Sequence, residues 1–382
     1  MKKLLLFLFL NSYFGFSQKI MIGLFADHTL RSVDISFQNG LYIIFTDSTL
    51  QRITDSSGTH LKIEATEKGL RLNIAGVIYN CNSIKLIPEK VSNFFRIKPL
   101  NSNLKERLYE GELHVEKTEK NNLKIMNFIE MNDYLEGVVE SEAGRGQLFE
   151  YYKVQSIISR TFALRNWNKH DKDGFNLCDQ VHCQAYLHKR NAPKNTIDSA
   201  VNATSNFVLT YQDTSFAPTF FHANCGGQIS DPEWVWNSSI GGLCTFNDPY
   251  CMNTKQGTWT KYIPLTVWKD YFKKTYDFPI EDSAYFSLLT NFKQDQRMSF
   301  FIHPQFGIPL RDIREEFRLK STYFSVKLEG NNVVLIGRGF GHGVGLCQDG
   351  AMQMAKSGYS SEEILYFYYP NTRLREQNPI RK

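Results

Sequence analysis

Three side chains that can bind a metal lie within six residues in the segment LCDQVHCQAY. Cys178, His182 and Cys183 form a C-x3-H-C pattern, and zinc prefers thiolate and imidazole ligands. The spacing is tight and differs from that of a zinc finger. A disulfide between Cys178 and Cys183, or two free thiols, are the alternatives. Cysteine ligands must be thiolates, so oxidation competes with metal binding.

A histidine in the segment GRGFGHGVG is a second candidate. Five glycines fall within nine residues around His342. Glycine permits a positive φ and close approach of backbone. The segment therefore predicts either a tight turn with an incidental His342, or a loop whose backbone lies close to a ligand at which His342 points.

Two helices are expected around the acidic segment VVESEAGRG. Apolar residues at helical spacing predict a helix over about 149–168. A shorter helix is predicted over 133–139, with Asn132 or Asp133 as its N-cap. Glu142 is then expected in the turn between the helices, where the flexible GRG run places a carboxylate at the edge of a cleft.

The remaining patterns predict a β-rich N-terminal region followed by mixed strands and helices. Further elements are expected as short strands over about 19–100, paired strands over 108–130, strand and loop over 201–260, partly helical chain over 261–330, a strand over 333–336, and helices over 349–356 and 361–368. Ser360 and Glu363 have the spacing of a capping box for the last helix.

The N-terminus, MKKLLLFLFLNSYFGFSQ, has a basic start, an apolar middle and small residues near its end. This pattern predicts a secretory signal peptide over residues 1–17. A membrane anchor is the alternative, but Asn11 and Ser12 interrupt the apolar run, which is shorter than the ~20 residues of a spanning helix. We expect an exported protein of the periplasm or cell envelope, with no transmembrane segment in the mature chain.

The composition excludes some partners. The 382-residue chain has a formal charge of only +5, and its basic residues form no stripe with aromatics. Nucleic acid is therefore not expected as a partner. The chain has seven cysteines, an odd number, so at least one is free, bound to a metal or paired between chains.

Four segments, taken in order, resemble the SpoIID/LytB family. They are YLEGVVESEAG…YYKVQSIISRTFALRN (134–166), LCDQVHCQAY (177–186), FFHANCGGQ (220–228) and GRGFGHGVGLCQDGAMQMAKSGYSSEEILYFYYPNTRL (337–374). The resemblance covers roughly residues 105–375. It implies an α+β fold, with mixed strands and helices around a substrate cleft, and a SpoIID-like catalytic domain over 105–375. With the predicted signal peptide (1–17) and the N-terminal β-rich module (18–104), the chain is expected to have three parts.

The resemblance implies a peptidoglycan lytic transglycosylase. Such enzymes cleave glycan strands, preferably stripped of stem peptides, after N-acetylmuramic acid and leave an anhydro-muramyl end. The alternative within the family is a non-catalytic peptidoglycan-binding protein that stimulates or localises another wall hydrolase. A zinc hydrolase of peptide or amide bonds is a further alternative, but the chain lacks His-Glu-x-x-His.

Glu142 matches the family's catalytic glutamate. One carboxylate is enough for this reaction, because the sugar's own primary hydroxyl attacks the anomeric carbon and no water must be activated. Glu140 is a nearby rival, but it stands where family members commonly have proline. Ala143 and Gly144 replace a Met-Pro pair that often follows the catalytic residue.

The resemblance also implies substrate and metal ligands. The predicted substrate-binding residues are Lys153, Gln155, Arg160, His222, His342 and Gln348. Zinc is expected on Cys178, Cys183 and the upstream His170, with water, substrate or His182 in the fourth position. Its role is structural or orienting, since the acid/base chemistry requires no metal.

Two further expectations concern cysteines and aromatics. Cys225 and Cys347 fall where many members of the family carry Ser or Thr, and we hypothesise a disulfide between them. Cys244 and Cys251 are hypothesised to form a second disulfide. Stacking on sugars is expected from aromatics such as Trp234, Trp236 and Tyr186.

Overall fold

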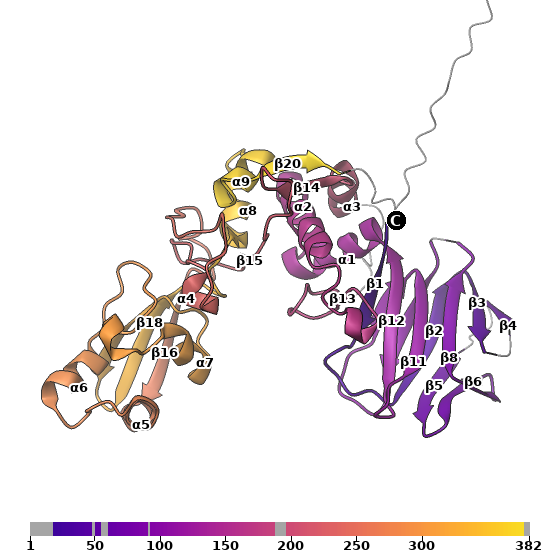
Figure 1. The fold of residues 1–382 in the computed structure, drawn as a ribbon, viewed down its shortest axis with the longest axis horizontal. Coiled ribbons are helices and arrows are strands. Elements are labelled where there is room, and N and C mark those ends of the chain that lie inside the picture. Colours follow the sequence, from indigo (N-terminus) through magenta and orange to yellow (C-terminus); the bar gives the residue numbers. More distant parts are fainter. Residues whose placement is uncertain (1–17, 48–49, 55–59, 91, 188–195, 378–382) are drawn as a thin grey trace, which may run out of the picture. The chain divides into compact units, whose positions relative to one another are not determined.

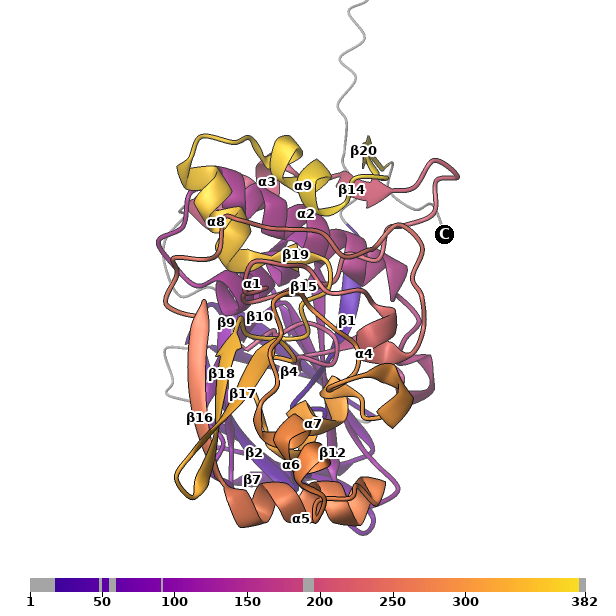
Figure 2. The ribbon, with the colours of Figure 1, turned by 90° about the vertical axis from the view of Figure 1, so that its left-hand side faces the viewer.

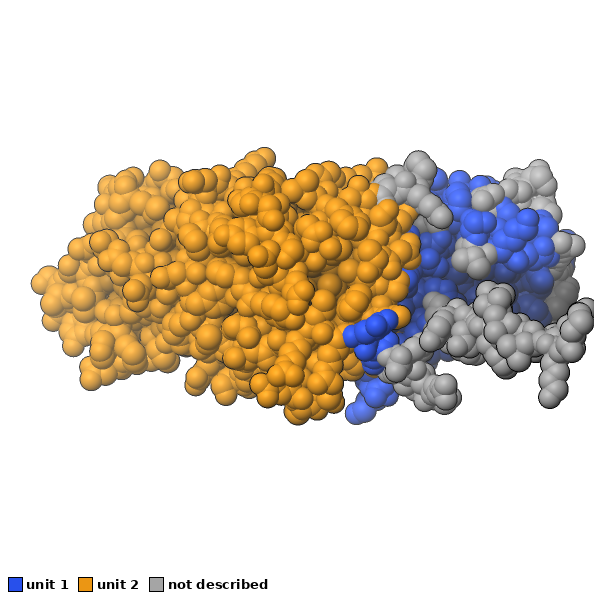
Figure 3. All heavy atoms as spheres, turned by 90° about the horizontal axis from the view of Figure 1, so that it is seen from above, with its two compact units in different colours: residues 1–137, 168–191, 376–382 blue, residues 138–167, 192–375 orange. Residues whose placement is uncertain are grey.

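The computed structural model describes residues 18–377 apart from 48–49, 55–59, 91 and 188–195. The predicted signal peptide lies outside the described residues. Within them, no helix is both long and apolar enough to cross a membrane. The chain forms two compact units, coloured in Figure 3. Unit 1 comprises residues 1–137, 168–191 and 376–382, and unit 2 comprises residues 138–167 and 192–375.

Unit 1 contains two β-sheets. Their strand orders are β13-β1-β12-β11-β8-β3-β4 and β10-β9-β2-β5-β6-β7 (Figure 1). The first sheet contains β1 (Lys19–Leu24), β3 (Leu41–Thr46), β4 (Leu50–Thr54), β8 (Ser83–Pro88), β11 (Glu112–Lys117), β12 (Leu123–Glu130) and β13 (Leu177–Cys178). The second contains β2 (Ser32–Asn39), β5 (His60–Thr66), β6 (Gly69–Ile74), β7 (Val77–Cys81), β9 (Phe94–Pro99) and β10 (Arg107–Glu110).

Alternation of side chains forms the core of unit 1. Along β1 and β5, for example, apolar side chains at alternate positions are buried, as expected for strands with one face against a core. The predicted N-terminal β-rich region is thus confirmed. Strands β10, β11 and β12 follow residue 104 in the chain but belong to these same two sheets. The domain boundary at residue 104 stays a prediction.

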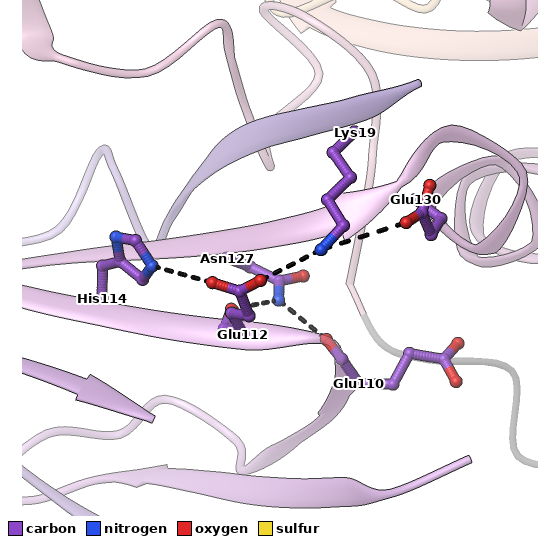
Figure 4. A network of polar contacts seen from close by, with 6 residues as sticks. All are labelled: Lys19, Glu110, Glu112, His114, Asn127 and Glu130. Carbon is purple, nitrogen blue, oxygen red and sulfur yellow. Dashed lines mark hydrogen bonds and ion pairs between the residues drawn. The ribbon is translucent and has the colours of Figure 1, made fainter. Parts of the chain in front are cut away.

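A buried asparagine holds the chain where it passes from one sheet to the other, between β10 and β11. Asn127 on β12 is fully buried, and its Nδ2 donates to the carbonyls of Glu110 at 2.8 Å and Glu112 at 2.9 Å (Figure 4). Its Oδ1 accepts from the hydroxyl of Tyr186 at 3.1 Å. The Glu112 carboxylate accepts from Lys19 at 3.0 Å. The backbone carbonyls of Glu110 and Glu112, at the point where the chain changes sheets, therefore both accept a hydrogen bond.

Helix α2 (Phe149–Arg165) is the centre of unit 2, and most of its side chains are buried. It contacts α3 (Thr196–Ala203), α8 (Gln348–Lys356), α9 (Ser361–Tyr368) and β14 (Phe207–Thr210) (Figures 1 and 2). Strand β14 pairs with β20 (Arg373–Glu376). The remaining short helical segments are α4 (Glu233–Trp236), η2 (Asp171–Asp173) in unit 1 and η3 (Pro304–Phe306).

Helix α1 (Met131–Ala143) differs from its prediction. It begins earlier than residue 133 and ends later than residue 139, so Asn132 and Asp133 are inside the helix and the predicted N-cap was wrong. Glu142 lies in the last helical turn and not in the connection between α1 and α2. The predictions for α2, α8 and α9 are confirmed to within a few residues.

Residues 258–338 of unit 2 form a sheet with a core of their own. Antiparallel strands β16 (Thr258–Pro264), β18 (Asn332–Arg338) and β17 (Phe324–Glu329) are in that order, accompanied by α5 (Leu265–Tyr276), α6 (Ser283–Thr290) and α7 (Leu310–Glu316). The fully buried Trp268 packs in this core against Phe272, Phe301 and Phe317. No residue of this core was a candidate for catalysis.

A capping box begins α9, as predicted. The Ser360 hydroxyl accepts from the Glu363 backbone amide at 3.3 Å, and the Glu363 carboxylate accepts from the Ser360 amide at 2.8 Å. We expect Ser360→Ala to lower the free energy of unfolding by about 1 kcal/mol, because the Glu363 amide in the first turn loses its hydrogen-bond acceptor. Ser360→Gly should lower the free energy of unfolding by only roughly a few tenths of a kcal/mol. Urea denaturation of both variants measures the difference, and equal losses would contradict the capping role.

Candidate functional site

Glu142 lies half-buried in the last turn of α1. Its backbone carbonyl accepts a hydrogen bond from Nε2 of Gln348, at the start of α8, at 3.3 Å. This contact with α8 holds the backbone that carries the Glu142 side chain.

A buried polar network lies behind Glu142. Gln155 of α2 is fully buried, and its Oε1 accepts from the Tyr151 hydroxyl at 3.2 Å and from Gln348 Nε2 at 3.4 Å. Its Nε2 donates to the Ser159 hydroxyl at 3.2 Å. Burial raises the pKa of Tyr151 well above its usual value, and the nearby charges of Cys347 and Glu142 raise it further. Tyr151 is thus a neutral hydrogen-bond donor, and Gln155 orients Gln348, which contacts the Glu142 carbonyl.

The segment after Glu142 is fixed by two contacts. Glu140 is buried and its carboxylate pairs with Arg145 Nε at 2.5 Å. The Tyr152 hydroxyl donates to the Gly144 carbonyl at 2.9 Å. The flexible GRG run is therefore tied to α2, and Glu140, the rival carboxylate, is occupied in an ion pair that holds this loop.

The two basic residues of α2 that were predicted to bind substrate have other partners. Lys153 forms an ion pair with Glu150 at 2.8 Å, and Glu150 also accepts from the Ser361 amide at 2.7 Å. Arg160 is buried, and its guanidinium donates to the carbonyls of Thr204 at 2.5 Å and Val201 at 3.4 Å. These bonds tie α2 to the end of α3. They give Arg160 a structural role and do not support its predicted contact with substrate.

Two histidines meet where the third and fourth resemblance segments pair. Strand β15 (Phe221–His222) is parallel to β19 (Leu346–Cys347), and the ring centroids of His222 and His342 are 5.4 Å apart. Trp236 lies 5.3 Å from His342 and is 40% exposed. An exposed indole beside an imidazole is an arrangement that suits the apolar face and hydroxyls of a sugar ring.

The hydrogen bonds fix the tautomers of both rings. His222 Nδ1 donates to the Val344 carbonyl at 3.1 Å, so its buried Nε2, which has no partner among the described residues, is an acceptor. His342 Nδ1 accepts from the Val344 amide at 3.0 Å. Burial lowers the pKa of His222 well below its usual value and that of His342 to about 4. Both rings are neutral at ordinary pH.

The glycines around His342 serve a contact inside the chain. A side chain at Gly341, where φ is +110°, would meet the His222 Cβ at 2.9 Å. The glycine segment thus lies against the strand that carries His222. These glycines thus allow a close approach of two segments of the chain, and the approach of this backbone to a ligand stays a prediction.

Of the aromatics expected to stack on sugar, Tyr186 was wrong. It is fully buried in unit 1 against Tyr109 and Tyr134, with ring centroids 5.5 Å and 5.0 Å away. Trp234 is partly buried, so Trp236 is the most exposed of the three.

The predicted metal ligands converge in unit 1. One ligand atom from each of His170, Cys178, His182 and Cys183 lies within 4.8 Å of the other three. His170 Nε2 is 3.5 Å from Cys183 Sγ, and His182 Nδ1 is 3.8 Å from Cys178 Sγ. The hydrogen bond from Cys178 lowers the pKa of Cys183 to about 7. Cys178 is on β13, whose pairing with β1 fixes one side of the cluster.

The two predicted disulfides are absent. All seven cysteines lie in the described residues, and each has a free thiol. Cys225 and Cys347 do meet, since the Cys225 amide donates to Cys347 Sγ at 3.3 Å, but Cys251 joins them with its Sγ 3.2 Å from that of Cys225. Cys244, the predicted partner of Cys251, is exposed.

Four residues of these sites were missed by the sequence analysis. They are Tyr151, Asp173, Asp248 and Cys251, which was expected beside Cys244 and lies instead beside Cys225. Asp173 accepts from His170 Nδ1 at 2.8 Å, and its spacing of three residues from a proposed ligand was a usable signal. Asp248 and Cys251 form a D-x2-C pattern, but their partners lie far away in the sequence.

The comparisons with known proteins agree with this geometry. The family described as SpoIID, Stage II sporulation protein, matches residues 119–211, which include Glu142, Gln155 and the four clustered ligands. These matches support the resemblance of the chain to the SpoIID/LytB family. It is 28% identical over 262 residues to Stage II sporulation protein D of Bacillus subtilis (strain 168), which covers 65% of this chain and 75% of that protein.

The further relatives have two kinds of name. Stage II sporulation protein D of Bacillus amyloliquefaciens is 26% identical over 262 residues, with 65% of this chain and 75% of the relative covered. The amidase enhancer of Bacillus subtilis (strain 168) is 26% identical over 294 residues, with 63% and 40% covered. The match therefore spans less than half of the amidase enhancer.

Proposed function

We propose that this chain is an exported peptidoglycan lytic transglycosylase with Glu142 as its general acid and base. One observation carries the proposal. Gln348, from the fourth resemblance segment, donates both to the Glu142 carbonyl and to Gln155, both from the first segment. The motifs that resemble the family thus meet at the backbone of the residue whose carboxylate the chemistry requires.

The reaction needs one proton to move twice. Glu142 in its protonated form gives its proton to the leaving glycosidic oxygen, and positive charge develops on the muramyl ring. The ring's primary hydroxyl then attacks the anomeric carbon, and its proton passes to the Glu142 carboxylate. The anhydro-muramyl end forms and Glu142 is again protonated, so no water and no second carboxylate take part.

Digestion of stripped and intact peptidoglycan by the purified chain tests the function. We expect anhydro-muramyl products in the mass spectrum, with more product from strands without stem peptides. The name of the amidase enhancer relative favours a second candidate, in which the chain binds the wall and stimulates another hydrolase. Binding of peptidoglycan without products, together with faster digestion by an added amidase, would support this second function.

We also propose that zinc binds His170, Cys178, His182 and Cys183. The donor set fits, because two sulfurs and two imidazole nitrogens converge and His170 is oriented by a carboxylate. Four protein ligands leave no open position, so the zinc is structural. It would hold β13 to η2, and it supplies no step of the proposed reaction.

Asp173 gives a test of this zinc site. Asp173→Asn should weaken zinc binding by about 10- to 100-fold, because the hydrogen bond that fixes His170 loses its negative acceptor. Asp171→Asn, in the same turn of η2, is the matched control and should leave the affinity unchanged. Competition with a chromogenic zinc chelator measures both affinities. Equal affinities for the two variants would contradict the assigned role of Asp173.

A further inference from the structure

A second cluster of metal-binding side chains lies in unit 2, apart from the residues proposed so far as ligands. Cys225, Asp248, Cys251 and Cys347 are fully buried, and one ligand atom of each lies within 4.8 Å of the other three. We propose that this cluster is a second site for a zinc-type cation, with three sulfur ligands and one carboxylate oxygen. This proposal does not depend on the transglycosylase activity.

The distances fit a tetrahedral ion after small movements. Cys225 Sγ is 3.2 Å from Cys251 Sγ and 3.2 Å from Asp248 Oδ2. Bonds of about 2.3 Å to sulfur and 2.0 Å to oxygen require separations of roughly 3.8 Å and 3.5 Å. Shifts of a few tenths of an ångström therefore make room for the ion.

Outer groups already orient two of the four ligands, Cys347 and Asp248. Cys347 Sγ accepts from the amides of Cys225 at 3.3 Å and Gly350 at 3.4 Å. Asp248 Oδ2 accepts from the Tyr368 hydroxyl at 2.9 Å, while Oδ1 accepts from the Tyr250 amide at 2.9 Å. Donors aimed at ligating sulfurs and carboxylates are the second shell that metal sites use.

The backbone leaves space for this arrangement at Gly350. A side chain there would meet the Tyr368 hydroxyl and would lie 2.6 Å from Asp248 Oδ2. Residue 350 is in the first turn of α8, whose N-cap is Cys347. Glycine at this position lets the helix start close to the carboxylate, so that the thiol and Asp248 face one another.

The charge of an occupied site can be compensated. Once an ion has displaced the thiol protons, three thiolates and a carboxylate place four negative charges in a buried site, which is costly without compensation. A dication neutralises two of them, and the buried guanidinium of Arg297, which donates to the Cys225 carbonyl at 2.7 Å, neutralises a third. Three thiol protons are released to solvent as the ion binds.

The site would stabilise the neighbourhood of Glu142. Its ligands come from three separate segments, around residues 225, 248–251 and 347. Cys347 immediately precedes Gln348, which donates to the Glu142 carbonyl. An ion at the cluster would thus fix the backbone from which Gln348 reaches Glu142, and it would replace the hypothesised Cys225–Cys347 disulfide as the link between the two loops.

Metal analysis of the purified chain tests the proposal. Removal of the first cluster by Cys178→Ser and Cys183→Ser should leave one zinc ion per chain. Cobalt bound at the second cluster in place of zinc should show the visible absorption bands of a tetrahedral ion. Its sulfur-to-cobalt charge-transfer absorption should be about 1.5 times that of cobalt at the first cluster, because three thiolates bind the ion instead of two. The Cys225→Ser, Cys251→Ser variant keeps only the first cluster and gives the absorption of a site with two sulfurs. Cys244→Ser removes an exposed cysteine outside both clusters and is the matched control, which should leave metal binding unchanged.

Two results would overturn the second site. One is a chain lacking the first cluster that binds no zinc or cobalt although it is folded by circular dichroism. The other is an intact mass lower by two hydrogens that maps to a disulfide among Cys225, Cys251 and Cys347. Should the Cys225→Ser, Cys251→Ser variant fail to fold, alkylation decides instead: the three thiols should be protected by zinc and react after chelation, while Cys244 reacts throughout.

Discussion

Glu142→Gln should reduce the release of anhydro-muramyl products by at least about 100-fold, since general acid–base catalysis contributes roughly 10²- to 10⁴-fold. Glutamine has the same shape but cannot give a proton to the leaving oxygen. The Glu142 carbonyl, which Gln348 contacts, is unaffected by the change. Binding to peptidoglycan and the unfolding midpoint should therefore stay close to those of the unchanged chain. Digestion of stripped strands, followed by mass spectrometry, measures the loss.

The matched control for this prediction is Glu140→Gln, two residues earlier in the same helix. Glu140 pairs with Arg145, so this variant should lose stability and retain most of the activity at a temperature where it is folded. A reversed pattern, with Glu140→Gln inactive and Glu142→Gln active, would show that Glu140 and not Glu142 is the catalytic carboxylate. Full activity of both variants would remove Glu142 from the mechanism.

Local signals were enough to predict the helices that hold this site. The 3.6-residue periodicity of α2 and the capping box of α9 depend on neighbours in the chain, and the structure confirms both. The end of α1 was missed, because buried contacts of its last turn extend the helix to Ala143, beyond the predicted stop at Val139. This difference moves Glu142 from a flexible turn to a helix end.

Clusters made by distant segments were harder to predict. Cys178, His182 and Cys183 are close in sequence, so their convergence was expected. Cys225 and Cys347 are 122 residues apart and meet because β15 pairs with β19, a register that no local pattern specifies. The resemblance suggested a meeting of these two, but Asp248 and Cys251 join only through the path of the intervening loop.

The largest expected effect on stability concerns unit 1. Arg107→Met should lower the free energy of unfolding by about 3–5 kcal/mol, because it leaves a buried charge without its partner. Arg107 Nη1 is 2.7 Å from Asp179 Oδ2, and Asp179 is fully buried beside the ligand Cys178. The Arg107 guanidinium also lies 4.3 Å from the Phe25 ring centroid. Hydrogen exchange of β1 and β13 amides measures the loss within unit 1.

An exposed ion pair of the same unit gives the control. Arg96 pairs with Glu106 at 2.5 Å, but the side chains are 39% and 46% exposed, so Arg96→Met should cost at most about 1 kcal/mol. Equal losses for Arg96→Met and Arg107→Met would show that burial of the Arg107 pair is unimportant.

Acid should rescue the Arg107→Met variant. Burial raises the pKa of Asp179 above its usual value, although the charge of Arg107 and the hydrogen bond from the Phe25 amide lower it in part. Without Arg107 the pKa rises further, and the cost of the buried carboxylate applies only above that pKa. The deficit relative to the unchanged chain should therefore be largest near neutral pH and shrink as the pH falls and Asp179 takes up a proton. Urea denaturation across this range measures it, and a deficit that is constant with pH would assign the loss to packing around Phe25 and not to an unpaired charge.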